Sequence, residues 1–306
     1  LVWDFIFHRS AATMSAKSVT LVAPFNGLPS EENFLITDSQ VPPLQGDGIQ
    51  VALLGFSPDP YMRGSMKSKA QGGSLEAGAV ITGFVVGKVT AVNGASTWVV
   101  GDLFGGSLPF TTVQTLSTAV LAKSLLWKLS DYLVEAEISK GLGVLGMPGS
   151  TAYGGLIDIL RPVEGETIFV SAASGAVGGL VGQLAKNVYK CKTVGSCGGP
   201  AKVSLITEKF GYDAAIDYKT VKDKVELQAK LKEAAPEGID MYFENVGGMH
   251  FNAAFDSLRR GGRIAICGGI STYHDDGPSS NSVNIMQMIY SFQRMEGFMC
   301  MPWLSG

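Results

Sequence analysis

The sequence lacks the features of a membrane protein or a nucleic-acid-binding protein. Its 306 residues contain no run of about 18 uninterrupted apolar residues, so we expect no membrane span. The net charge is −3, so no strong field favours nucleic acid or an anionic membrane. Residues 1–13 lack the basic start and full apolar core of a signal peptide. Because Met14 is a more natural start, we expect residues 1–13 to be a non-native or disordered leader.

Cysteine and histidine are also scarce. None of the four cysteines forms C-x-x-C, and residues 14–133 contain neither Cys nor His. A catalytic zinc held by Cys and His ligands from that half is therefore excluded, and we predict no metal site. A nucleophile elbow for serine hydrolysis is missing too. We expect reduced, structural thiols in a cytoplasmic protein.

Two patterns divide the chain. Short β-type runs broken by Gly and Pro fill residues 17–133, which predicts a compact, mostly antiparallel β domain over 14–134. From about residue 135 strands and helices alternate, which predicts an α/β domain with a doubly wound parallel sheet over 135–306. Its expected strands are 167–172, 191–196, 213–218, 238–246, 262–269 and 296–301, with helices after residue 176 and over 200–210, 221–234, 251–260 and 284–294.

A turn of very small residues follows the first of these strands. The segment VSAASGAVGGL begins at Val170, and Ala173–Gly178 within it fits G-x-G-x-x-G with alanine in the first place. The pattern gains weight because it follows a strand and opens a helix. Small residues let a pyrophosphate approach the backbone, and the helix N-terminus offers free N–H groups. The pattern therefore predicts dinucleotide binding, the alternative being a tight turn with close helix–strand packing.

The region after the second strand indicates which coenzyme binds. An NAD site has an acidic residue about 20 residues after the glycine turn, to bind the ribose 2′-hydroxyl. Here that region reads VGSCGGPAK and contains no carboxylate, but it does contain Ser196, a glycine pair and Lys202. A hydroxyl, open amides and an ammonium suit a 2′-phosphate, so we predict NADP(H). Lys202 could equally be an ordinary exposed helix lysine.

The remaining chemistry is hydride transfer without a metal. Hydride addition to the β-carbon of an enal or enone puts negative charge on the carbonyl oxygen, which a hydroxyl donor can stabilise. Tyrosine is such a donor at neutral pH. Two tyrosines are candidates: Tyr273, in a loop after the fifth strand, and Tyr61, in the Pro-containing turn SPDPYMR. Each could instead simply pack its ring in a turn.

Six segments in this order resemble one known family. They are DPYMR at 59–63, GMPGSTAYGGL at 146–156, AASGAVGGLVGQLAK at 172–186, DYKT at 217–220, FENVGG at 243–248 and GRIAICGGISTY at 262–273. Together they resemble the zinc-independent medium-chain dehydrogenases/reductases, in the branch of prostaglandin reductases and NADPH-dependent 2-alkenal reductases. The resemblance spans about residues 17–303. It implies a GroES-like β domain before the Rossmann domain, NADPH-dependent reduction of the α,β double bond of 2-alkenal or 15-oxoprostaglandin-type substrates, and a homodimer.

The resemblance also implies roles for single residues, carried over by motif. Tyr273 would donate to the developing enolate, and Tyr61 would line the substrate pocket. Lys202 would contact the 2′-phosphate, with Tyr218 near that phosphate or its ribose. The coenzyme would also lie against Met147, Thr151, Ala173, Gly175, Ala176, Val177, Gly178, Ser196, Asn245, Cys267, Gly268, Gly269 and Ile270.

Two features depart from the family. The loop CGGPAK places Pro200 before Lys202, which could reposition the lysine. The chain stops at Gly306, so we expect the segment that returns to the β domain in the family to be missing. Two alternatives remain open. One is an NADPH:quinone oxidoreductase on the same scaffold, and the other is a non-catalytic NADPH-binding protein.

Overall fold

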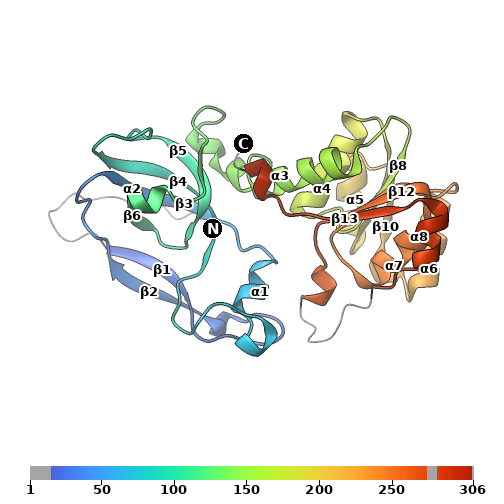
Figure 1. Ribbon diagram of the computed structural model, residues 1–306, viewed down its shortest axis with the longest axis horizontal. Coiled ribbons are helices and arrows are strands. Elements are labelled where there is room, and N and C mark those ends of the chain that lie inside the picture. The colour runs from blue at the N-terminus through green and yellow to red at the C-terminus, as the bar shows by residue number, and fades with distance from the viewer. Residues whose placement is uncertain (1–14, 274–280, 305–306) are drawn as a thin grey trace. The chain divides into compact units, whose positions relative to one another are not determined.

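The structure, a computed structural model, describes residues 15–273 and 281–304 (Figure 1). Residue contacts divide the chain into two compact units. Unit 1 takes the chain up to Pro24, Ser30–Ser57 and Leu75–Ile138, and unit 2 takes Phe25–Pro29, Pro58–Ser74 and everything from Ser139. Within the described ranges, no helix is both long enough and apolar enough to cross a bilayer.

Unit 1 is built from antiparallel strands, as the sequence predicts. A five-stranded sheet has the order β6-β3-β4-β5-β7, and a separate hairpin pairs β1 with β2. The strands are β1 (Ser15–Leu21), β2 (Phe34–Gln40), β3 (Gly48–Phe56), β4 (Thr82–Asn93), β5 (Leu103–Pro109), β6 (Val113–Ser117) and β7 (Leu126–Lys128), with the short helix α2 (Thr118–Leu121).

Unit 2 contains a six-stranded parallel sheet of order β10-β9-β8-β11-β12-β13. The first strand of this unit, β8, lies in the middle, and the order reverses between β8 and β11. The strands are β8 (Thr167–Val170), β9 (Lys192–Cys197), β10 (Ala214–Asp217), β11 (Ile239–Glu244), β12 (Leu258–Ile266) and β13 (Arg294–Gly297). This is the doubly wound topology that the alternating pattern predicts.

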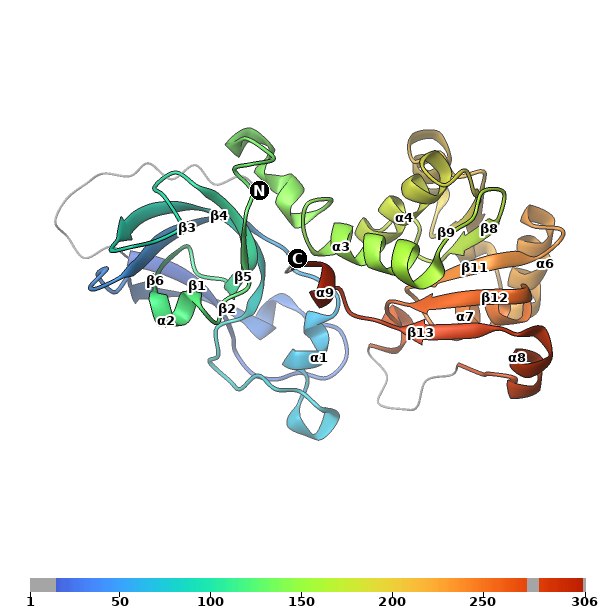
Figure 2. The same ribbon diagram turned by 45° about the horizontal axis from the view of Figure 1, so that its top comes forward.

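Helices cover both faces of that sheet (Figure 2). Strand residues alternate between the faces, so Val170 and Phe243 pack under α4, whereas Phe169 and Tyr242 pack against α6 and α7. The helices of unit 2 are α1 (Met62–Met66), α3 (Met147–Tyr153), α4 (Ala176–Asn187), α5 (Pro200–Ser204), α6 (Lys224–Ala234), α7 (Gly248–Asp256), α8 (Ile285–Ser291) and α9 (Met301–Leu304), with a π-helix over Gly154–Leu160.

The predicted boundaries differ from the structure most clearly at two places. The helix expected over 251–260 ends at Asp256, because β12 begins at Leu258 and its first residue pairs with Ile239 of β11. The last strand, expected over 296–301, is instead Arg294–Gly297. Phe292 adopts a left-handed conformation (φ 51°) that ends α8 early, and Arg294 then pairs with Arg263. Partner strands, rather than local periodicity, set both boundaries.

Candidate functional site

The candidate site lies at the carboxyl ends of the parallel strands of unit 2. In a doubly wound sheet these ends form a crevice where the strand order reverses, which here is between β8 and β11. The segments that leave the two strands are Ser171–Gly175 and Asn245–Gly247. They meet directly, because the side-chain amide of Asn245 donates to the Ser171 carbonyl at 2.8 Å.

The predicted phosphate turn follows β8 and leads into α4. Gly175 is the N-cap of this 12-residue helix, and Gly175 and Ala176 are both exposed. Gly178 is buried, and a Cβ there would lie 2.5 Å from the carbonyl oxygen of Ala172. The turn is therefore closed on its inner side and open at the helix end, where free N–H groups suit an anion. This cradle fits a diphosphate.

The other two residues predicted in this turn support it from within. Ala173 is fully buried, and its N–H donates to the carbonyl of Ser196 at 2.9 Å, which joins the turn to the end of β9. Val177 is half-buried and packs on the core beneath α4.

Ser196 and Tyr218 lie where the adenosine end of a dinucleotide is expected. The Ser196 side chain is buried, and its Oγ lies 2.7 Å from Nε2 of His250, so its hydroxyl is engaged inside the protein. Tyr218 is 39% exposed and meets the His250 ring edge-on at 5.4 Å. Its own ring covers Gly198. His250 thus supports both predicted residues, although Ser196 lies in β9 and Tyr218 directly follows β10.

The loop after β9 is held by a carboxylate that the sequence analysis missed. The N–H groups of Gly199 and Lys219 donate to Asp217 Oδ1 at 2.9 and 3.0 Å. Asp217 ends β10, beside β9, so strand order brings it to this loop. Gly199 has φ 95° and caps α5, in which Lys202 is exposed. Among the described residues no ion pair engages the Lys202 ammonium.

Tyr273 lies over the ends of β11 and β12. A Cβ built on Gly268 would be 3.0 Å from the Tyr273 hydroxyl and 3.7 Å from the carbonyl oxygen of Asn245. The N–H of Ile270 donates to that same Asn245 carbonyl at 3.1 Å, which holds the segment carrying Tyr273. The structure therefore brings Tyr273, Asn245, Gly268 and Ile270 together, as the motifs predict.

A second group of predicted residues gathers around Cys300. Thr151 is buried, its hydroxyl donates to the Met147 carbonyl at 2.7 Å, and it lies close enough to the Cys300 thiol to affect the pKa of that thiol. Burial and then the nearby Cys300 raise the pKa of Cys267 to about 12. Burial, Asp59 and Cys300 likewise raise the pKa of Tyr61 to about 12. Cys300 was not predicted as a site residue, since nothing in its local sequence marks it.

The segment that carries Tyr61 belongs to a different unit than the sequence predicts. The sequence analysis assigns SPDPYMR to the β domain, but the contacts place Pro58–Ser74 in unit 2. Tyr61 directly precedes α1 and is 47% exposed. A tyrosine from the first part of the chain is thereby brought to the same unit as Thr151 and Cys267.

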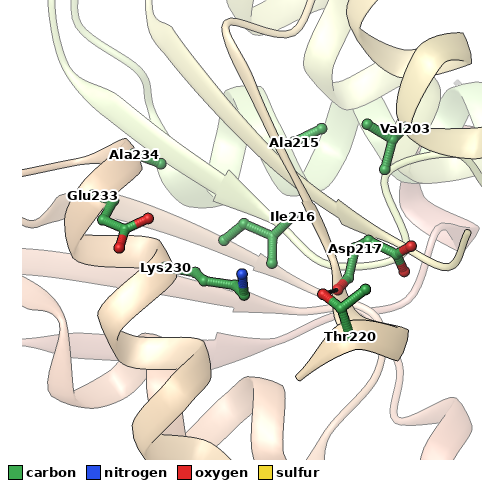
Figure 3. Close-up of a pocket in the computed structure, with 8 residues that line it drawn as sticks. All are labelled: Val203, Ala215, Ile216, Asp217, Thr220, Lys230, Glu233 and Ala234. Carbon is green, nitrogen blue, oxygen red and sulfur yellow. Dashed lines mark hydrogen bonds between the residues drawn. The ribbon is translucent and has the colours of Figure 1, made fainter. Parts of the chain in front are cut away.

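Two further hollows lie in unit 2, and the first of them is also lined by Asp217. One of about 460 Å³ lies beside the edge strand β10, between α5 and α6, where Lys230 and Glu233 face Ile216 and Thr220 (Figure 3). The other, of about 780 Å³, is lined by residues of α3, α4 and α9, among them Tyr153, Leu184 and Trp303. Neither hollow is lined by a residue predicted from the sequence. Among the residues the structure describes, no three His, Cys, Asp or Glu side chains group as metal ligands.

Comparisons with known proteins show what the chain is similar to. Residues 17–124 match a family described as the N-terminal domain of oxidoreductase, and residues 176–303 match one described as zinc-binding dehydrogenase. The chain is 39% identical to prostaglandin reductase 1 of Bos taurus, over 94% of this chain and 83% of that protein. It is also 39% identical to the 2-alkenal reductase (NADP(+)-dependent) of Nicotiana tabacum, over 94% and 82%. Among solved structures, CurA of Vibrio vulnificus in complex with NADPH matches with a TM-score of 0.75 and 33% identity, over 93% and 82%.

Proposed function

The chain belongs to the prostaglandin reductase and 2-alkenal reductase branch of the medium-chain dehydrogenase/reductase family, and we propose that it reduces the α,β double bond of enals and enones with NADPH. Two relatives carry names that state this kind of chemistry, and a third was solved with NADPH bound. The observation that carries the proposal is the position of the Tyr273 hydroxyl over Gly268, beside the Asn245 carbonyl. A hydroxyl donor at the carboxyl ends of β11 and β12 can stabilise a substrate oxygen that gains negative charge.

Some residues of this chain bind the coenzyme, and others stabilise the charge that forms on the substrate. Gly175 and Ala176 present the open end of α4 to the coenzyme diphosphate. NADPH, when bound, supplies the hydride that adds to the β-carbon of the substrate. Tyr273 donates a hydrogen bond to the substrate carbonyl oxygen and so stabilises the enolate that forms. The enolate then takes up a proton from water at its α-carbon, which completes the reduction of the double bond. Tyr61 lines the substrate side, and its raised pKa keeps its hydroxyl protonated and able to donate.

The reaction needs no metal in this proposal, because residues 14–133 lack the Cys and His side chains from which a zinc site would be built.

Preference for NADPH is assigned to Lys202, whose exposed ammonium lies in the helix that follows the loop after β9. The Asp217 carboxylate near this loop does not argue for NADH, since two backbone N–H groups already engage it.

The activity is tested with a panel of enals, enones and quinones, each assayed with NADPH and with NADH. We expect turnover of enals and enones with NADPH. Tyr273→Phe should lower kcat by about 100-fold or more, as loss of one oxyanion donor does. Tyr132→Phe, at a tyrosine that is 74% exposed in unit 1, is the matched control and should change nothing. Turnover of quinones alone, or tight NADPH binding with no turnover, would replace the proposal with one of its alternatives.

The coenzyme preference has its own test. Lys202→Ala should weaken NADPH binding by about tenfold or more, because a charge-assisted contact of about 1.5–3 kcal/mol is lost. NADH binding should stay unchanged. Lys209→Ala removes an exposed lysine further along the same helical segment and should leave both affinities intact. Equal weakening of NADPH and NADH by Lys202→Ala would contradict the assignment.

We also propose a homodimer in a reducing compartment such as the cytoplasm. β13 is the last strand in its sheet, so one of its edges pairs with no other described strand. The neighbouring helix α8 exposes Ile285, Ile289 and Tyr290. An open strand edge next to apolar side chains favours association. Light scattering of the purified protein measures the mass of the assembly directly.

The four cysteines are all free thiols, which supports a reducing compartment such as the cytoplasm.

A further inference from the structure

Glu244 joins the two strands at which the sheet order reverses. It is the last residue of β11 and is 1% exposed. Its Oε1 accepts hydrogen bonds from the N–H groups of Val246 at 2.5 Å and Gly247 at 2.9 Å, and from the Ser171 hydroxyl at 3.1 Å. Ser171 directly follows β8, and its oxygen in turn accepts from the Asn245 N–H at 2.9 Å. One buried carboxyl group therefore shapes the start of both segments that border the crevice.

The second oxygen of this carboxyl group has a different environment. Glu244 Oε2 and the Tyr242 hydroxyl are both buried, and neither has a well-aligned hydrogen bond within the described residues. The two side chains share one face of β11, because residues two apart in a strand point the same way. They are also close enough for the tyrosine to act on the titration of the carboxyl group. Two adjacent buried polar atoms without partners are costly, and a hydrogen bond between them would engage both.

The groups that act on this carboxyl group carry no charge. They are the Gly247 and Val246 N–H groups and the hydroxyls of Tyr242 and Ser171. An ionised carboxylate buried without a cation is unfavourable, and burial raises the pKa of Glu244 despite these donors. A neutral acid fits the geometry, since its carbonyl oxygen accepts at Oε1 while its hydroxyl at Oε2 donates to Tyr242.

The segment after Glu244 also holds the proposed donor. The Ile270 N–H donates to the Asn245 carbonyl at 3.1 Å, and the Ser271 N–H donates to the Val246 carbonyl at 2.9 Å. These two bonds set the course of the chain that leads to Tyr273. A change in Asn245–Gly247 therefore moves the Tyr273 hydroxyl, even though Glu244 does not reach the crevice itself.

We propose that Glu244 is a protonated positioning residue, hydrogen-bonded through Oε2 to Tyr242, that holds Asn245–Gly247 and through it Tyr273 in place for the reaction. The catalytic part of this inference rests on the proposed function. The protonation state of Glu244 is a property of the protein without substrate, so it can be tested separately from the proposed function.

The test compares Glu244→Gln, Glu244→Ala and the control Glu164→Gln, at an exposed carboxylate in the turn before β8. Glutamine keeps a carbonyl for the three donors and an N–H for Tyr242, so this variant should keep kcat within about threefold. Alanine should lower kcat by about 100-fold, as a displacement of about 1 Å at a reacting group does. Its KM for the enal should change much less. Glu164→Gln should match the wild type in every assay.

Infrared spectroscopy of the coenzyme-free protein tests the protonation state without any turnover. The wild type and Glu164→Gln should show the carbonyl stretch of a protonated carboxylic acid at neutral pH, and Glu244→Gln should lose that band. The inference is overturned if the band is absent from the wild type, if Glu244→Gln is as slow as Glu244→Ala, or if Glu244→Ala keeps full kcat. If Glu244→Ala does not fold, the glutamine variant and the infrared band still decide. A wild type that shows the band but reduces no enal would count against the proposed function, not against the protonated acid.

Discussion

Two glycines three residues apart in the phosphate turn allow a sharp test of its geometry. A Cβ at Gly178 would lie 2.5 Å from the Ala172 carbonyl oxygen and 2.9 Å from the Ala173 Cα. Ordinary contact begins at 3.4 Å, so α4 and the turn would have to separate by 3.4 − 2.5, about 0.9 Å. Ala172 cannot move easily, because it already has a strained φ of 50°. Overpacking of this kind costs about 1–3 kcal/mol.

Alanine also favours helix over glycine by up to about 1 kcal/mol, which offsets part of this cost. We therefore expect Gly178→Ala to lose about 1–2 kcal/mol of unfolding free energy. At about 2–4 °C per kcal/mol for a unit of this size, Tm should fall by about 2–8 °C. Thermal unfolding of the coenzyme-free protein measures this directly.

Gly175→Ala is the matched variant, with the opposite expectation. Gly175 is exposed, and a Cβ there would approach only the Ala172 oxygen, at 3.1 Å. Tm should therefore change little. The new methyl group would project at the open helix end, so the NADPH Kd from a fluorescence titration should rise at least about tenfold. An unchanged Tm in Gly178→Ala, or unchanged NADPH binding in Gly175→Ala, would refute the geometry assigned to this turn.

Three further predictions concern the support of the sheet. Tyr212→Phe removes the buried hydroxyl that donates to the Gly178 carbonyl at 2.7 Å, and denaturant unfolding should show a loss of about 1 kcal/mol. Arg263→Met leaves the Glu166 carboxylate without the guanidinium that binds it at 2.6 and 2.8 Å. In the same assay the free energy of unfolding should fall by about 2–4 kcal/mol. A loss below about 1 kcal/mol would count against this role of Arg263. Burial lowers the pKa of His250 to about 4, below its unfolded value of about 6.5. As the pH falls, the unfolded chain therefore binds the proton before the folded protein does. The stability that a neutral His250 contributes is complete above a pH of about 6.5. It falls toward pH 4 by up to about 1.4 kcal/mol per pH unit. That slope should flatten in His250→Gln, and an equal slope in both proteins would exclude His250 as its source.

Much of the unit 2 fold could be predicted because its signals are local. Alternating strand and helix patterns predicted a parallel doubly wound sheet, and the small residues at Ala173–Gly178 predicted a turn that the structure shows. The boundary errors at Asp256 and Arg294 arose where pairing with a neighbouring strand overrode the local pattern. Glu244 and Asp217 went unnoticed for a related reason. In the sequence each is an ordinary strand-end acid, and one of its hydrogen-bond donors follows a neighbouring strand: Ser171 for Glu244 and Gly199 for Asp217.

The amino-acid sequence by itself determined the class of fold, the turn of small residues before α4 and the place of Tyr273 after a strand, because these depend on side-chain size and spacing within a few residues. Only the tertiary structure decided which strand ends lie side by side. It brought Ser171 to Glu244 across 73 positions and Ser196 to His250 across 54, and it placed Tyr61 in the unit that contains Cys300. Strand order and helix packing make these contacts, and no local pattern records which strand becomes the neighbour of which.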